Sequence, residues 1–330
     1  MAKADDDHLS EEYAMLMVML LDLLKPVMRG EDVWPSLLDS LEENAKVFHA
    51  DEYGENPYYK NIKFDDVTSG RFKLTHSFYH GYELFVYDAP ARKGDTLTDI
   101  PRIGCFDKDF YFPAINEGND AWMSVTPNEI ITMNGPVSQA SGRVLTLGLG
   151  MGYYAYMVSL KDDVSSVTII EREDDVIELF EKYILPQFSH KEKINIIKAD
   201  AVEYMKNLPD GEYDYCFADI WQGMDDIASY FLVKEACRRR FSKMKMSYWI
   251  EDVYINALLS SVYFDISLSF YKEAGIPLPN IGNLGEAAKR QYDYVHRLLD
   301  NEEIKKPEHI DYYMTPGTLL RMIEETDEIF

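Results

Sequence analysis

The stretch Arg143–Gly152, RVLTLGLGMG, decides the fold of this chain. Its apolar run, Val144–Leu149, leads into a turn with glycine at alternate positions, Gly148, Gly150 and Gly152. A short apolar run without polar alternation is typical of a strand that is buried on both faces of a parallel sheet. Glycines after such a strand let the backbone turn sharply and approach a ligand closely. The stretch therefore predicts a strand and a ligand-binding turn, with a helix to follow.

Further apolar runs follow this turn at regular intervals. They are Val167–Ile170, Ile194–Ile197, Tyr213–Ala218 and Ser247–Ile250, and helical patterns such as Asp174–Leu185 lie between them. Strands that alternate with helices form right-handed βαβ units. The predicted fold class is therefore α/β with a mostly parallel sheet.

Carboxylates follow three of these predicted strands. Glu171 comes directly after the second strand, Asp200 follows the third and Asp219 follows the fourth. Because open parallel sheets bind ligands at the carboxyl ends of their strands, we expect these acids to meet the glycine turn in one crevice. Glu171 lies 23 residues after Gly148, which is the spacing of an acid that binds ribose hydroxyls. Asp200 would lie near the base of a nucleoside.

The composition of the turn excludes two common nucleotide motifs. The third glycine of a GxGxxG dinucleotide fingerprint is replaced by Tyr153, and the turn contains no basic residue and no phosphate-binding lysine. The turn therefore favours a nucleoside ligand without a pyrophosphate.

Four segments together resemble the motifs of class I S-adenosylmethionine-dependent methyltransferases, and most closely those of the spermidine synthase-like branch. They are VLTLGLGMG, SVTIIERE, IIKADAVEYM and YDYCFADIW. The resemblance covers residues 143–220 well and 61–140 loosely. It implies a Rossmann-like core that binds S-adenosylmethionine and follows a small β-rich domain. It also makes a homodimer one option, because related synthases commonly form dimers.

The resemblance further implies a set of cofactor-binding residues. They are Gly148, Leu149, Gly150, Met151, Gly152, Glu171, Arg172, Asp200, Ala201, Asp219 and Trp221. The turn would surround the methionine part, Glu171 the ribose, and the Asp200–Ala201 pair the adenine. Asp219 would be the catalytic base, or it would only orient the ligand. Trp221 would wall the pocket or, as is more common for tryptophan, pack in the core.

The same segments depart from the aminopropyltransferases of that branch. Their aspartate inside the glycine motif is Met151 here, and their acidic segment after the fourth strand is replaced by Asp219-Ile220-Trp221-Gln222. The favoured function is therefore methyl transfer to an unidentified acceptor, preferably a small molecule. The alternatives are a polyamine aminopropyltransferase that uses decarboxylated S-adenosylmethionine, and a non-catalytic scaffold that binds a nucleoside.

Local patterns divide the rest of the chain. We expect a helical segment over residues 1–60, a β-rich lead-in over 61–140, and the Rossmann-like domain with a helical C-terminal extension over 141–330. The helical patterns are Glu11–Val27, Leu37–Phe48, Leu284–Leu299 and Gly317–Glu325, and the strand-like ones are Phe72–His76, Glu83–Tyr87 and Ile130–Met133.

Composition restricts the partners. The chain has 330 residues, 33 of them Lys or Arg and 58 Asp or Glu, for a net charge of −25. Nucleic acids and anionic membranes attract clustered basic residues, so neither is an expected partner, whereas a cationic acceptor gains weak support. The three widely spaced cysteines, the acidic start of the chain and the short apolar run Ala14–Leu21 favour a soluble, cytoplasmic protein. No metal site is predicted.

Overall fold

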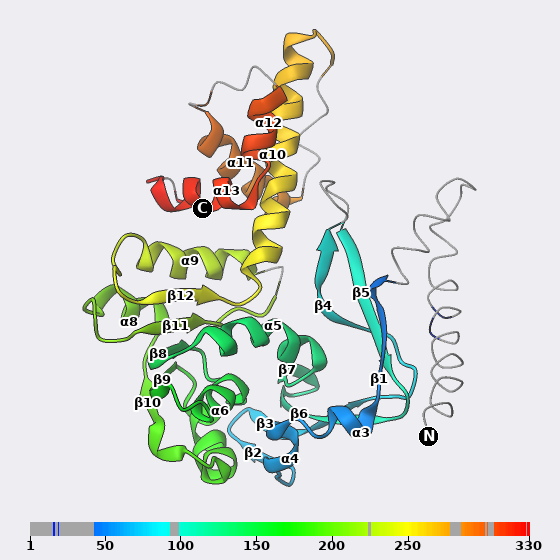
Figure 1. Ribbon diagram of the computed structural model, residues 1–330, viewed down its shortest axis with the longest axis vertical. Helices are drawn as coiled ribbons and strands as arrows, with labels where there is room; N and C mark the ends of the chain where they lie inside the picture. Colours follow the sequence, from blue (N-terminus) through cyan, green and yellow to red (C-terminus); the bar gives the residue numbers. More distant parts are fainter. Residues whose placement is uncertain are drawn as a thin grey trace. The chain divides into compact units, whose positions relative to one another are not determined.

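The computed structural model describes residues 16, 19, 43–92, 99–223, 226–277, 285–300, 302, 307–327 and 329–330 (Figure 1). The chain divides into two compact units, Met1–Lys198 and Ala199–Phe330. Most of the expected helix Glu11–Val27 lies outside the described residues. The sequence-based boundaries after residues 60 and 140 divide the chain at other places, because they rest on composition and on the resemblance. They stay a prediction.

Two β-sheets and two short helices form the first half of the first unit. The four-stranded sheet is antiparallel, with the order β2 (Val67–Ser69), β3 (Phe72–Tyr79), β6 (Phe110–Glu117) and β7 (Asp120–Ser124). The three-stranded sheet has the order β1 (Ala45–Phe48), β5 (Asp99–Phe106) and β4 (Phe85–Arg92). The helices are α3 (Ala50–Tyr53) and α4 (Pro57–Asn61). The β-rich region expected before the core is therefore present.

Two local expectations in this region are wrong. Ala45–Phe48 falls in the segment expected to be helical, but it forms β1 and pairs in parallel with β5. The ring of Phe48 stacks 5.7 Å from the ring of Phe85, so long-range pairing and packing outweigh the local helical pattern. Ile130–Met133 was expected to be a strand but lies in helix α5 (Pro127–Gln139). Thr126 caps that helix and Pro127 occupies its first turn, and these start signals outweigh the β-branched residues.

A five-stranded sheet forms the α/β core. Its strands are β8 (Gly142–Leu147), β9 (Val164–Glu171), β10 (Ile194–Lys198), β11 (Tyr215–Ala218) and β12 (Lys245–Tyr248), in the order β10-β9-β8-β11-β12. The pairs β10·β9, β8·β9 and β11·β12 are parallel. Helices α6 (Tyr153–Ser159), α7 (Asp174–Leu179), α8 (Ala201–Asn207) and α9 (Ile227–Cys237) alternate with the strands. The predicted Rossmann-like α/β fold is confirmed.

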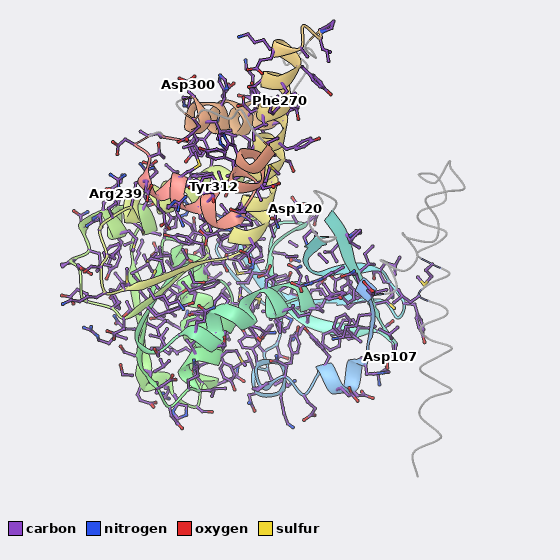
Figure 2. The ribbon with its side chains drawn as sticks, turned by 45° about the horizontal axis from the view of Figure 1, so that its top comes forward. Asp107, Asp120, Arg239, Phe270, Asp300 and Tyr312 are labelled. Atoms are coloured by element: carbon purple, nitrogen blue, oxygen red, sulfur yellow. The ribbon has the colours of Figure 1, made fainter. Side chains whose placement is uncertain are left out.

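The second unit ends in four helices. They are α10 (Glu251–Glu273), α11 (Glu286–Leu299), α12 (Pro307–Tyr313) and α13 (Pro316–Glu325), so the two predicted C-terminal helices are confirmed. Helix α12 is fixed to α13 by Tyr312, labelled in Figure 2, whose ring lies 5.6 Å from the Arg321 guanidinium.

Helix α10 is long and apolar enough to cross a membrane by length and composition alone. It contacts α11 and α13, which cover part of its apolar surface. Its buried Asp265 lies 2.7 Å from His296 of α11, a polar pairing that suits a helix packed inside a protein. These contacts show that α10 packs against other helices of the second unit, and the absence of a membrane partner stays a prediction.

Candidate functional site

The turn after β8 is built from glycines in a backbone conformation that other residues rarely adopt. The φ angles of Gly148, Gly150 and Gly152 are 98°, 57° and 73°. The amide of Gly148 donates to the carbonyl of Ile170 in β9 at 2.9 Å, and the amide of Gly152 donates to the carbonyl of Leu149 at 2.9 Å. The alternate glycines are therefore required by the path of the chain itself.

Neighbouring side chains press against two of these glycines. A Cβ atom at Gly152 would overlap the ring of Phe180, and one at Gly150 would lie 3.0 Å from the sulfur of Met123. Phe180 begins a π-helical turn, Phe180–Ile184, that continues α7, and π-helical turns often occur at functional sites. Close approach and positive φ thus both restrict Gly152 to glycine.

Glu171 ties the glycine turn to the end of β9. One carboxylate oxygen accepts a hydrogen bond from the amide of Leu149 at 3.1 Å, and the other accepts from the amides of Arg172 at 2.7 Å and Glu173 at 2.9 Å. Glu171 is only 8% exposed, so these three donors stabilise the buried carboxylate. The structure therefore brings the predicted glycine turn and the predicted ribose-binding acid together.

Two neighbouring amides at the centre of the turn are candidates for a ligand contact. In the part of the chain that the structure describes, the backbone N–H groups of Gly150 and Met151 have no hydrogen-bond acceptor. The carbonyl of Met151, in contrast, accepts from the hydroxyl of Tyr58 at 2.5 Å. Adjacent unpaired amides are suited to binding an anionic group such as a carboxylate.

Asp200 and Ala201 lie at the start of α8 in the second unit. The side chain of Asp200 accepts a hydrogen bond from the amide of Glu203 at 3.0 Å and so caps the helix. Ala201 is buried. This helix cap is a role that the sequence analysis did not assign to Asp200, and its predicted contact with adenine stays a prediction.

Asp219 follows β11 and titrates near neutral pH. Its removal from solvent raises the pKa of its carboxyl to about 7, because burial disfavours the charged form. A carboxyl with such a pKa can exchange a proton at neutral pH, which is the property expected of a general base.

Trp221 packs in an aromatic cluster of the second unit. Its ring lies 5.7 Å from the ring of Tyr230 and 6.3 Å from that of Tyr254, in edge-to-face arrangements. The side chain is 4% exposed, and its indole N–H has no acceptor among the described residues. The geometry supports the packing role that the sequence analysis left open.

Three residues that hold the turn were missed. Met123 and Phe180 contact its glycines, and Tyr58 binds its carbonyl, yet all three lie far from the turn in the sequence. The repeated glycines of the turn indicate that other groups approach its backbone closely, but they do not indicate which residues those groups belong to.

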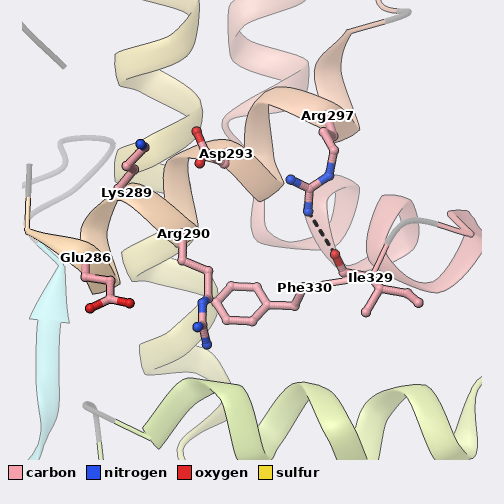
Figure 3. A pocket seen from close by; sticks show the side chains of 7 residues that line it. All are labelled: Glu286, Lys289, Arg290, Asp293, Arg297, Ile329 and Phe330. Carbon is pink, nitrogen blue, oxygen red and sulfur yellow. Dashed lines mark hydrogen bonds between the residues drawn. The ribbon is translucent and has the colours of Figure 1, made fainter. Parts of the chain in front are cut away.

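A pocket of about 400 Å³ lies elsewhere in the second unit (Figure 3). It is lined by Glu286, Lys289, Arg290, Asp293, Arg297, Ile329 and Phe330. The Arg297 guanidinium donates to the carbonyl of Ile329 at 2.8 Å, so this contact fixes the last residues of the chain against α11. None of the predicted site residues lines this pocket.

Solved structures with a similar fold include enzymes of the two kinds that the sequence motifs resemble. A spermidine synthase from Thermotoga maritima is 16% identical, with 44% of this chain and 57% of the synthase covered and a TM-score of 0.31. A precorrin-6y C5,15-methyltransferase from Geobacter metallireducens is 16% identical, with 40% of this chain and 71% of that chain covered and a TM-score of 0.28. No protein-family model and no curated protein matches the sequence. The similarity therefore concerns the fold.

Proposed function

We propose that the chain is an S-adenosylmethionine-dependent methyltransferase that binds its cofactor at the glycine turn of the first unit. The observation that carries this proposal is the connection between the turn and Glu171, made by the hydrogen bond from the amide of Leu149. It joins a turn with two unpaired amides to a carboxylate that can accept from a ribose hydroxyl. The absence of basic residues from the turn supports a ligand without phosphate groups.

The residues of the turn fit such a ligand. The unpaired amides of Gly150 and Met151 would bind the carboxylate of the methionine part. A carboxylate offers about four acceptor positions, and Glu171 uses three of them on amides. It would therefore accept one ribose hydroxyl while it continues to hold the turn. The side chain of Arg172 is largely exposed. Arg172 would therefore contribute through its backbone amide, which holds the carboxylate of Glu171.

The cofactor would supply a methyl group on a positively charged sulfur. The chain would hold the nucleophile of the acceptor in line with that group, which removes most of the entropic barrier to transfer. Asp219 would take the proton of a nucleophile that arrives protonated, and its near-neutral pKa suits this task. Asp200 and Ala201 would contact the adenine, as the resemblance implies. A small-molecule acceptor and a cytoplasmic location complete the proposal.

Titration calorimetry with S-adenosylmethionine tests the proposal. We expect the wild type to bind, Glu171→Ala to lose binding, and Glu171→Gln to bind more than tenfold more weakly. The glutamine amide would present donors to backbone donors and leave part of the buried hydrogen bonding unmade. Glu181→Gln, an exposed change in the same unit, should bind like the wild type.

Two outcomes would contradict the proposal. The first is a wild-type protein that does not bind, and the second is undiminished binding by Glu171→Ala. Incubation with decarboxylated cofactor and putrescine distinguishes the aminopropyltransferase alternative, because that reaction alone releases methylthioadenosine. Binding without turnover of any methyl acceptor would favour the scaffold.

A further inference from the structure

Helix α4 contacts α6, the helix that follows the glycine turn. Tyr58 of α4 is fully buried, and its ring lies edge-on to the rings of Tyr153 and Tyr156, 5.5 Å from each. Its hydroxyl donates to the carbonyl of Met151 at 2.5 Å. A residue far ahead of the α/β core in the sequence therefore binds the centre of the turn.

This contact matters because the turn has little conformational preference of its own. Glycines flank Met151 on both sides, and both have positive φ angles. Glycine populates many backbone conformations at similar energy, so the peptide unit after Met151 depends on hydrogen bonds to hold its orientation. Inside the turn the Gly152 amide donates to the Leu149 carbonyl at 2.9 Å, and the carbonyl of the unit needs a partner from outside the turn. The Tyr58 hydroxyl is the hydrogen-bond partner that the described residues offer to the Met151 carbonyl.

The two unpaired amides of the turn lie next to this peptide unit in the chain. The Met151 carbonyl points toward Tyr58, while the Gly150 and Met151 amides have no acceptor in the described part of the chain. These amides lie in the two peptide units just before the one that Tyr58 holds. Loss of the Tyr58 hydroxyl would leave the buried carbonyl unpaired, which is energetically unfavourable, and a shift of the turn that relieves this cost would displace the amides. The hydrogen bond to the Met151 carbonyl therefore restrains the adjoining backbone that carries the two amides.

We propose that Tyr58 is a positioning residue that holds the glycine turn in its ligand-binding conformation, so that α4 belongs to the architecture of the cofactor site. This inference rests on the proposed function for its ligand. The hydrogen bond itself is a property of the free protein.

The same helix offers a matched control. Tyr59 is also buried, and its hydroxyl donates to the carbonyl of Val125 at 2.7 Å, ahead of helix α5. Tyr59→Phe removes one buried hydroxyl from the same helix, just as Tyr58→Phe does, but it leaves the glycine turn untouched. A general loss of stability should therefore affect both variants, whereas a loss of positioning should affect only one.

The test compares wild type, Tyr58→Phe and Tyr59→Phe by two measurements. Calorimetry with S-adenosylmethionine should show an affinity three- to tenfold weaker for Tyr58→Phe and unchanged for Tyr59→Phe, in line with the loss of one buried hydrogen bond. Amide hydrogen exchange without ligand should be faster at Gly150–Gly152 in Tyr58→Phe alone.

The two measurements separate the failure of this inference from that of the proposed function. Unchanged exchange in the turn, or equal effects of both variants, would overturn the positioning role. Faster exchange confined to Tyr58→Phe, with no binding of the ligand even by the wild type, would support the positioning of the turn and overturn the proposed function.

Discussion

Replacement of Asp219 by asparagine is expected to stabilise the protein at pH 8 by about 2 kcal/mol. Asparagine has nearly the same shape as aspartic acid and carries no charge. It therefore avoids the cost of an ionised carboxyl that is removed from water. Most single substitutions destabilise a protein, so a gain of this size would be unusual.

The direction of this stability change follows from the number of protons that the folded and unfolded states bind. The pKa of Asp219 is about 7 in the folded protein, whereas its ordinary value is 3.8. Between these pH values the folded state keeps a proton that the unfolded state has released, so a rise in pH favours unfolding. The full difference corresponds to roughly 4 kcal/mol, and we expect about half of it, because Asp219 is only partly buried by its surface area and solvent screens part of the cost. The cost is absent below the unfolded pKa and complete above about pH 7.

Urea unfolding of both proteins between pH 5 and pH 8 measures this effect. The advantage of Asp219→Asn should grow as the pH rises toward 7 and then level off. Asp210→Asn is a control of opposite sign in the same unit, because hydrogen bonds from Ser242 lower the pKa of Asp210. That variant should lose stability at neutral pH. A constant difference between Asp219→Asn and wild type across this range would contradict the prediction.

A carboxyl that destabilises the folded state is informative about function. Stability is often sacrificed at active sites, where a strained or desolvated group is needed for chemistry. The near-neutral pKa of Asp219 therefore supports its proposed role as a base.

The fold of the core could be predicted because its strands are buried on both faces. Runs such as Val167–Ile170 and Tyr213–Ala218 are continuously apolar, and this pattern survives without any knowledge of their partners. Ala45–Phe48 has no such run. Its strand exists because β5 offers a neighbouring edge, and a partner about 58 residues away leaves no local trace.

The site could be predicted only where one short segment carries the signal. The glycine turn and Glu171 are local features whose spacing indicates a nucleoside site. The helix cap formed by Asp200 could also have been predicted, since Glu203 follows at the spacing typical of a capping box. Tyr58 lies 93 residues before its partner Met151, so the contact could not be predicted from one sequence.

Substitution of Gly152 by alanine is expected to destabilise the protein by about 3 kcal/mol or more and to weaken S-adenosylmethionine binding. Its positive φ costs an L-residue roughly 1–2 kcal/mol. The new methyl group would also overlap the Phe180 ring, and such overpacking typically adds about 1–3 kcal/mol. Movement of either group would displace the turn that holds the proposed ligand.

Gly118 provides the matched control for this substitution. Its φ of 62° is close to that of Gly152, and a Cβ atom there would meet nothing within 4 Å. Gly118→Ala should therefore lose only about 1–2 kcal/mol of unfolding free energy, the cost of the positive φ angle alone. It should bind the ligand normally. The difference in unfolding free energy between the two variants isolates the contact with Phe180.

A double-mutant cycle tests whether Phe180 is the cause. Leucine lacks the outer ring atoms that the new methyl group would overlap. Gly152→Ala combined with Phe180→Leu should therefore be less destabilised than the sum of the single changes, by at least about 1 kcal/mol. Additive free energies would contradict the contact. Ligand affinity should recover in the double variant in parallel with stability, because one overlap causes both losses.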